Sequence, residues 1–302
     1  IIIFQLDKLE EFYMNERFES TKKTGILGIC GNVFLLIIKA TVGFICHSQA
    51  MIADSMNSAG DIFASLMTFI GNKIASVPKD ADHNFGHGKA EYIFSMFISI
   101  SMMFISIKLF YDALLSLING SKLIFSWSLV LVCLITIFIK LLLYIYTNKQ
   151  TQKYNNILLE ANKEDHRNDC IVTTFTLISI ILSFFHIYWF DGLVGIGISI
   201  WIFYTGINIF IESYNVLMDI SIDTDTEKNI LDIANTYKEI LKIKEISSVP
   251  VGQEYVVFLT ICVDGSTSTY DSHLLADNLE KEISHINKIY KAIVHVEPLI
   301  KA

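Results

Sequence analysis

The chain contains six apolar stretches, each long enough to cross a lipid bilayer as a helix. A hydrocarbon core of ~30 Å needs about 20 helical residues, and the stretches are about 20–27 residues long. They occupy residues 25–45, 50–75, 91–117, 123–146, 163–185 and 188–212. The sequence therefore predicts an α-helical membrane protein with six transmembrane helices.

Composition agrees with this class. Hydrophobic residues make up 52% of the 302 residues and charged residues only 18%, against about 25% in a soluble domain. The formal charge of −8 is concentrated after residue 219, which argues against nucleic acid as a partner. The first 20 residues are charged and lack a long apolar core, so they do not resemble a cleavable signal peptide.

Basic residues mark alternate connectors between the apolar stretches. They lie in the first 23 residues, after the second stretch and after the fourth: Lys8, Arg17, Lys22, Lys23, Lys73, Lys79, Lys89, Lys149, Lys153, Lys163 and Arg167. The positive-inside rule then places both termini in the cytoplasm. We expect a multi-pass protein of a lipid bilayer, most simply a bacterial plasma membrane.

Two pairs of polar residues interrupt the apolar stretches. Asn57 and Asp61 lie in the second stretch, and Asp165 and Asp169 lie in the fifth. Each pair has i, i+4 spacing, so both side chains point from one face of a helix. A carboxylate near the membrane centre costs at least ~2.5–3.5 kcal/mol, which is typical of an ion or proton path. Polar contacts between helices, or a turn just outside the membrane, are the alternatives.

The residues after 212 follow a different pattern. Helical periodicity covers 226–241 and 272–286, whereas β-branched and aromatic residues predict strands at 243–249, 254–264 and 292–296. The order αββαβ predicts a small ferredoxin-like α+β domain with two helices on one face of a three-stranded sheet. We therefore expect a transmembrane domain at 1–212 and a cytoplasmic domain at 213–302 that pairs with a second copy.

Several segments together resemble the cation diffusion facilitator family. They are ADSMNSAGD at 53–61, PKDADHNFGHGKAE at 78–91, the acidic pair of the fifth stretch and IVHVEP at 293–298. The resemblance covers nearly the whole chain. It implies a homodimeric exporter, not an enzyme, that exchanges a cytosolic divalent metal ion for protons by alternating access. It implies no catalytic cofactor.

The resemblance assigns Asn57, Asp61, Asp165 and Asp169 to the transport site. Zinc-handling members usually carry His at the position of Asp165, and this chain does not. Oxygen donors without imidazole favour Mn²⁺ over Zn²⁺, with Fe²⁺ as a further candidate and Mg²⁺ or Ca²⁺ ranked lower. His166 lies about 100° around the helix from Asp165, so we expect it to be a neighbour or a proton acceptor rather than a ligand.

Two further groups of residues match accessory positions of the family. Asp80, His83 and His87, close to Asp82, match a loop metal site, although loop packing explains such a cluster equally well. Lys89 and Asp219 match a charge interlock between subunits, which we expect to be partly buried.

The cytoplasmic domain matches the family's metal site only in part. His273, His295 and Glu297 lie at positions that resemble ligands. Lys244 and Thr260 stand where other members have two further histidines, and an ammonium group opposes cation binding. We therefore expect this domain to serve dimerisation, with at most a weak metal site.

Two other classes of protein remain as alternatives. An intramembrane aspartyl protease also places Asp residues on two helices that share a proton. It leaves the second residue of each polar pair, the histidine-bearing loop and the C-terminal domain without a role. A metal sensor or scaffold that moves no ions is the other alternative.

Overall fold

The computed structural model describes residues 2–45, 49–119, 126–185, 187 and 189–299. The chain forms two compact units. The helical unit contains residues 1–76 and 90–214, and the α/β unit contains residues 77–89 and 215–302. The loop at 77–89 therefore groups with the C-terminal part of the chain, although it connects two long helices.

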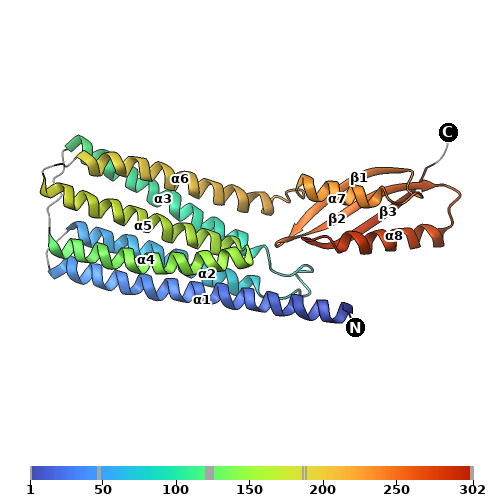
Figure 1. Ribbon diagram of the computed structural model, residues 1–302, viewed down its shortest axis with the longest axis horizontal. Helices are drawn as coiled ribbons and strands as arrows, with labels where there is room; N and C mark the ends of the chain where they lie inside the picture. The colour runs from blue at the N-terminus through green and yellow to red at the C-terminus, as the bar shows by residue number, and fades with distance from the viewer. Residues whose placement is uncertain (1, 46–48, 120–125, 186, 188, 300–302) are drawn as a thin grey trace. The chain divides into compact units, whose positions relative to one another are not determined.

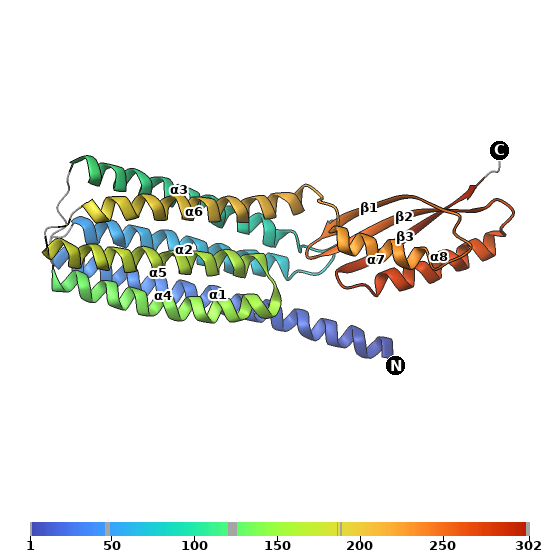
Figure 2. The same cartoon turned by 45° about the horizontal axis from the view of Figure 1, so that its top comes forward.

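Long helices run lengthwise beside one another in the helical unit (Figures 1 and 2). They are α1 (Ile2–Ile45), α2 (Gln49–Ala75), α3 (Ala90–Asn119), α4 (Trp127–Tyr154), α5 (Ile157–Phe184) and α6 (Trp189–Leu217). Helix α5 packs against α1, α2, α3 and α4, so its polar residues lie among side chains from several helices.

Small residues allow α6 to approach α3 closely. A Cβ atom added at Gly195 would lie 2.8 Å from the Ala113 side chain, and one at Gly206 would lie 2.9 Å from Met103. Close approach through small residues is a common way for helices to associate within lipid.

Four helices among the described residues are long and apolar enough to cross a membrane. The segments are Tyr13–Val42, Ala90–Ile118, Trp127–Tyr154 and Gly192–Leu217. Helices α2 and α5 are of similar length, at 27 and 28 residues, and carry the polar pairs. The prediction of six spans is therefore confirmed for a multi-helix membrane unit and stays a prediction for α2 and α5.

Several predicted helix boundaries were wrong. Helix α1 begins at Ile2 rather than at residue 25, and α5 begins at Ile157 rather than at residue 163. The charged start of α5 is helical because its side chains pair with one another: Lys163 contacts Glu160 at 2.6 Å and Glu164 at 3.2 Å. Asp165 therefore lies about two turns inside the helix.

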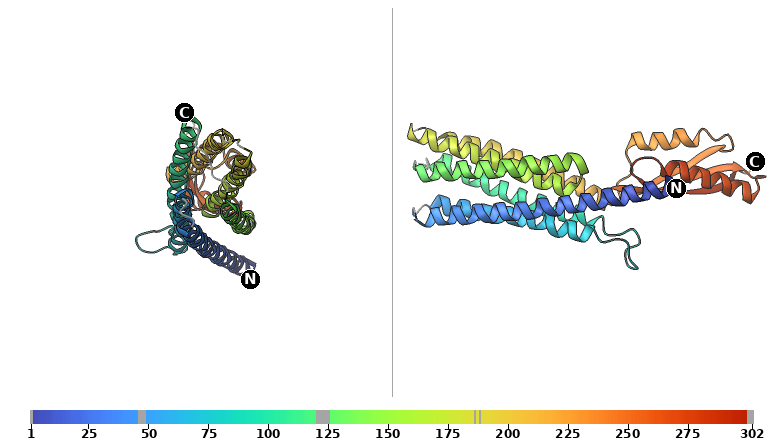
Figure 3. Two further views of the ribbon diagram at one scale, coloured as in Figure 1. Left: turned by 90° about the vertical axis from the view of Figure 1, so that its left-hand side faces the viewer. Right: turned by 60° about the horizontal axis from the view of Figure 1, so that its bottom comes forward.

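The α/β unit contains α7 (Thr224–Ala234), β1 (Lys242–Val251), β2 (Glu254–Asp264), α8 (Thr269–Ser284) and β3 (Ile289–Leu299). Strand β2 lies in the centre of the sheet, antiparallel to β1 and parallel to β3. Alternate residues of β2, from Val257 to Val263, form one core with apolar residues of α7 and α8. Both helices therefore cover the same face of the sheet, as predicted from the αββαβ order (Figure 3).

The predicted helix at 226–241 is too long. Asp223 caps α7 by accepting a hydrogen bond from the Thr226 backbone N–H, and the helix ends at Ala234. Residues Tyr237 and Ile240, which fit the helical period, pack against the core from turns instead. Apolar spacing alone did not distinguish a helix from turns that bury the same side chains.

Candidate metal site

Side chains of α2, α4 and α5 meet at a buried cluster of charges. The ammonium nitrogen of Lys140, on α4, lies 2.7 Å from Oδ2 of Asp61 on α2. The same nitrogen donates a hydrogen bond to Oδ2 of Asp169 on α5. The structure thus brings one acidic residue from each predicted polar pair to a single lysine.

Lys140 was absent from the residues predicted to form the site. Its side chain is only 1% exposed. It is the one charged residue in the apolar stretch 123–146, and an isolated charge in such a stretch indicates a functional position. That signal was available in the sequence, whereas its two partners on other helices were not.

The ion pairs of Lys140 compensate charges that are costly to bury. Two unit charges 4 Å apart attract by ~4 kcal/mol at an effective dielectric constant of about 20. A second lysine, Lys39 of α1, is also buried and interacts electrostatically with Asp169. The hydrogen bonds of Lys140 thus place two carboxylates and an ammonium group from three helices beside one another, so that buried charges of opposite sign face each other.

Asp165 lies in the same cluster. Asp165, His166 and Asp169 each offer one ligand atom, and these atoms lie within 4.8 Å of one another. Asp165 and His166 are buried, and Asp169 is half-buried. A group of this size and chemistry fits a divalent cation.

His166, which we expected to be a neighbour or a proton acceptor rather than a ligand, lies beside the acidic pair. Residues 166 and 169 have i, i+3 spacing and are neighbours on the helix surface, and this brings the imidazole beside the carboxylates. Neither ring nitrogen of His166 has a hydrogen-bond partner among the described residues, nor does Oδ2 of Asp165. The nearby donors therefore include nitrogen as well as oxygen.

The prediction that Asn57 contributes to the site concerns a side chain that lies outside the described part of the structure. Its backbone belongs to α2, one turn before Asp61.

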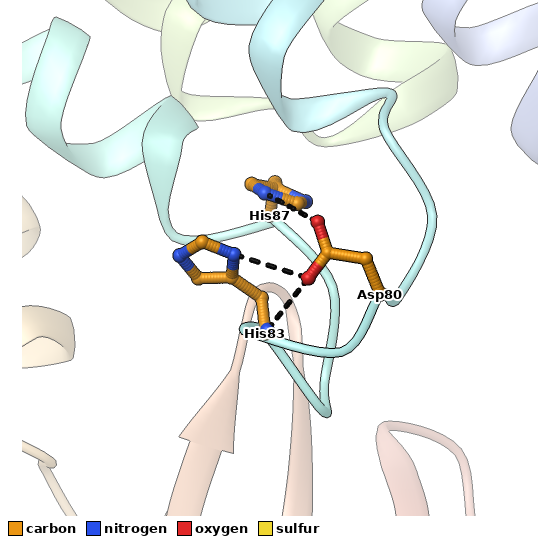
Figure 4. Close-up of side chains that lie close together, drawn as sticks. All are labelled: Asp80, His83 and His87. Atoms are coloured by element: carbon orange, nitrogen blue, oxygen red, sulfur yellow. Dashed lines mark hydrogen bonds and ion pairs between the residues drawn. The ribbon is translucent and has the colours of Figure 1, made fainter.

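The loop at 77–89 gathers a second group of metal-binding side chains. One ligand atom from each of Asp80, His83 and His87 lies within 4.8 Å of the other two. The Asp80 carboxylate points toward both imidazole rings (Figure 4), 3.3 Å from Nδ1 of His83 and 3.6 Å from Nε2 of His87. Gly86, at φ +75°, provides the left-handed turn between the two histidines.

Asp80 also shapes the loop. Its Oδ1 atom accepts backbone hydrogen bonds from His83 at 2.7 Å and Asp82 at 3.0 Å. The bond from the His83 backbone N–H holds the pKa of Asp80 below its usual value, so the carboxylate is charged at neutral pH. One aspartate thus holds the backbone of the loop and also places its carboxylate beside both imidazole rings.

Lys89 and Asp219 form an ion pair within one chain. Lys89 Nζ lies 2.7 Å from Asp219 Oδ1, and the two side chains are 37% and 54% exposed. The expected partial burial is not present in the single chain.

In the α/β unit, Lys244 forms an ion pair with Glu297, one of the residues predicted to be a metal ligand. Its Nζ donates to both Glu297 oxygens, at 2.7 and 2.6 Å, and these bonds lower the pKa of Glu297. His295 Nε2 lies 3.9 Å from Glu297, whereas His273 is 75% exposed and lies beside Asp277 instead. Among the described residues, the predicted trio of His273, His295 and Glu297 does not form one metal-ligand group.

Comparison with known proteins decides the family. A family profile for the cation efflux transmembrane domain matches residues 25–218, and one for the cytoplasmic domain of cation efflux proteins matches residues 222–299. The chain belongs to the cation diffusion facilitator family. It is accordingly a membrane transporter for metal efflux rather than an enzyme, and the aspartyl protease alternative is set aside.

Several bacterial relatives of this cation diffusion facilitator cover most of the chain. The manganese efflux system protein MneS of Bacillus subtilis (strain 168) is 28% identical over 94% of this chain and 99% of its own length. MneP of the same organism is 25% identical over 94% and 98%. The cation-efflux pump FieF of Shewanella oneidensis is 25% identical over 88% and 90%.

Proposed function

We propose that this transporter exports Mn²⁺ from the cytoplasm in exchange for protons. The observation that carries the proposal is the buried cluster in which Asp61 of α2 and Asp169 of α5 share Lys140, with Asp165 and His166 beside Asp169. Two relatives named as manganese efflux proteins support the choice of ion.

The donor atoms of the proposed site suit Mn²⁺, and they also accept Zn²⁺ and Fe²⁺. Asp61, Asp165, Asp169 and the side-chain oxygen of Asn57 are hard donors, which suit Mn²⁺. The imidazole of His166 adds a nitrogen that Zn²⁺ and Fe²⁺ also accept. Zn²⁺ or Fe²⁺ export is therefore the second candidate.

The transport cycle follows from a single site that opens to each side in turn. We propose that α1–α6 all cross the bilayer, with both termini in the cytoplasm. Mn²⁺ enters the acidic cluster from the cytoplasm, and rocking of the helices exposes it on the outer side. The bacterial plasma membrane would supply the inward proton gradient.

Flux into proteoliposomes tests this proposal directly. The purified full chain is reconstituted with an enclosed metal-responsive dye and, in parallel, a pH-responsive dye. We expect Mn²⁺ influx faster than Zn²⁺, Fe²⁺ or Mg²⁺ influx, with proton movement in the opposite direction. Metal binding without flux would identify a sensor or scaffold, and metal flux without proton movement would rule out antiport.

Changing Asp165 to His is expected to move selectivity toward Zn²⁺. An added imidazole supplies a borderline-soft donor in place of a carboxylate, so the ratio of Zn²⁺ to Mn²⁺ flux should rise by about tenfold or more. The Asp165→Asn variant is the control, because it removes the same charge without adding an imidazole. An unchanged ratio in Asp165→His would show that this position does not determine ion choice.

Lys89 and Asp219 are proposed to stabilise a homodimer near the inner membrane surface, as the family resemblance implies. Replacing Lys89 with Ala should lower the yield of chemically crosslinked dimer by about twofold or more, because an exposed pair contributes up to about 1 kcal/mol. Lys228→Ala, at an exposed lysine of α7, is the matched control. Equal yields from the two variants would contradict the interlock.

A further inference from the structure

Lys140 has no role in the transport cycle described so far, yet it contacts two residues of the proposed site. Its Nζ atom bonds Oδ2 of both Asp61 and Asp169. It is among the largest side chains that are fully buried in the chain. A lysine that served only to neutralise charge would need one carboxylate, whereas this lysine bridges one from each polar pair.

A metal ion and the Lys140 ammonium compete for the same atoms. A divalent ion binds a carboxylate oxygen at about 2.0–2.6 Å. With Nζ 2.7 Å from Asp61 Oδ2, an ion on that oxygen would lie within a few ångströms of a positive charge. The ammonium must therefore leave at least one carboxylate when the ion binds.

We propose that Lys140 is a tethered counter-ion that occupies the transport site between ions and is displaced when a divalent ion binds. This inference rests on the proposed function. In this role Lys140 has two effects on transport. It lowers metal affinity, because the ion must replace a cation already present. It also speeds release, because the ammonium returns to the carboxylates as the ion leaves.

The tethered charge also favours divalent over monovalent ions. Exchanging an ammonium for a monovalent cation gains no charge at Asp61 and Asp169, whereas a divalent ion gains one. Electrostatic attraction to the two carboxylates therefore favours displacement only by the more highly charged ion.

The helix offers the displaced ammonium an alternative partner. Thr136 lies one turn before Lys140 on α4, and its buried hydroxyl oxygen has no hydrogen-bond partner among the described residues. Helical side chains point toward the N-terminus, which is the direction from Lys140 to Thr136. The Thr136 hydroxyl can accept the bond that Asp61 or Asp169 loses.

Neutral variants of Lys140 test the proposal. Lys140→Met and Lys140→Gln are purified as full-length protein, and Mn²⁺ affinity is measured by competition with a metal-binding dye. We expect affinity to increase by about tenfold or more and maximal flux in proteoliposomes to fall by a similar factor, since displacing one buried ion pair is a large electrostatic term. Lys108→Met, at an exposed lysine of α3, should match the wild type. Unchanged or weaker Mn²⁺ binding in a folded variant would overturn the proposal.

A measurement on the wild-type chain tests the proposal even where the Lys140 variants fail to fold. Reductive methylation of lysines is followed by mass spectrometry with and without saturating Mn²⁺. We expect Lys140 to be modified at least about threefold faster with Mn²⁺, while Lys163, which pairs with Glu160 and Glu164, keeps its rate. Equal rates of Lys140 methylation with and without bound Mn²⁺ would overturn the proposal that Lys140 is a displaced counter-ion. A wild type that neither binds nor moves divalent ions would overturn the proposed function itself.

Discussion

Replacing Asp61 or Asp169 with Asn is expected to abolish metal transport while the chain still folds. Asparagine preserves the size of the side chain and removes one negative charge from the buried cluster. The lost attraction to the ion is ~4 kcal/mol per unit charge of the ion at an effective dielectric constant of about 20, so flux should fall by at least about a hundredfold. Initial Mn²⁺ influx into proteoliposomes measures the effect.

The matched control is Asp112→Asn on α3. Asp112 also lies in a candidate membrane span, but its side chain is exposed and it belongs to no group of metal-binding residues among those the structure describes. Its flux should remain within about twofold of the wild type, as for surface substitutions generally. Flux close to the wild type in Asp61→Asn and Asp169→Asn would remove the carboxylate cluster as the transport site.

The sequence predicted the general fold because its signals are local. Apolar stretches of membrane length identified the long helices. Helical periodicity identified the two helices of the α/β unit, and β-branched and aromatic residues identified its strands. The predicted helix boundaries differed from the structure where the end of a helix is polar. The segment 157–162 fell in the predicted connector before the fifth apolar stretch, yet it is helical, since charged side chains pair along the helix.

The candidate site was predictable only in part. The i, i+4 spacing within each polar pair identified Asp61 on one helix and Asp165 and Asp169 on another. The structure shows that α4 supplies a cation, Lys140, between Asp61 and Asp169. Contact between three helices depends on how they pack, which one sequence does not reveal. For a related reason, the angle around the helix axis did not show how close the His166 imidazole lies to the two carboxylates, because that angle ignores the length of the side chain.

A second buried ion pair predicts the largest effect on stability. Arg17 of α1 pairs with Glu91 of α3, and both side chains are almost fully buried. Asn156, just before α5, donates a hydrogen bond to the other Glu91 oxygen at 3.1 Å. The cluster therefore joins α1, α3 and the connector before α5 through charged and polar groups that are buried away from water.

Replacing Arg17 with Met should destabilise the chain by about 3–5 kcal/mol, because it leaves the Glu91 carboxylate buried without its cation. Thermal unfolding of the detergent-solubilised protein, followed by size-exclusion fluorescence, measures the shift. The double variant Arg17→Met with Glu91→Leu should recover most of the loss, since an apolar pair replaces the ions without an orphaned charge.

The Lys22→Ala variant separates a buried pair from an exposed one on the same helix. Lys22 contacts Glu19 at 3.0 Å, and both side chains are about half exposed. Solvent screens that pair, so its loss should cost no more than about 1 kcal/mol. If Arg17→Met melted at the same temperature as Lys22→Ala, burial of the Arg17–Glu91 pair would not be what joins the helices. If the double variant melted as low as Arg17→Met, the lost contact would matter through packing rather than through the uncompensated charge.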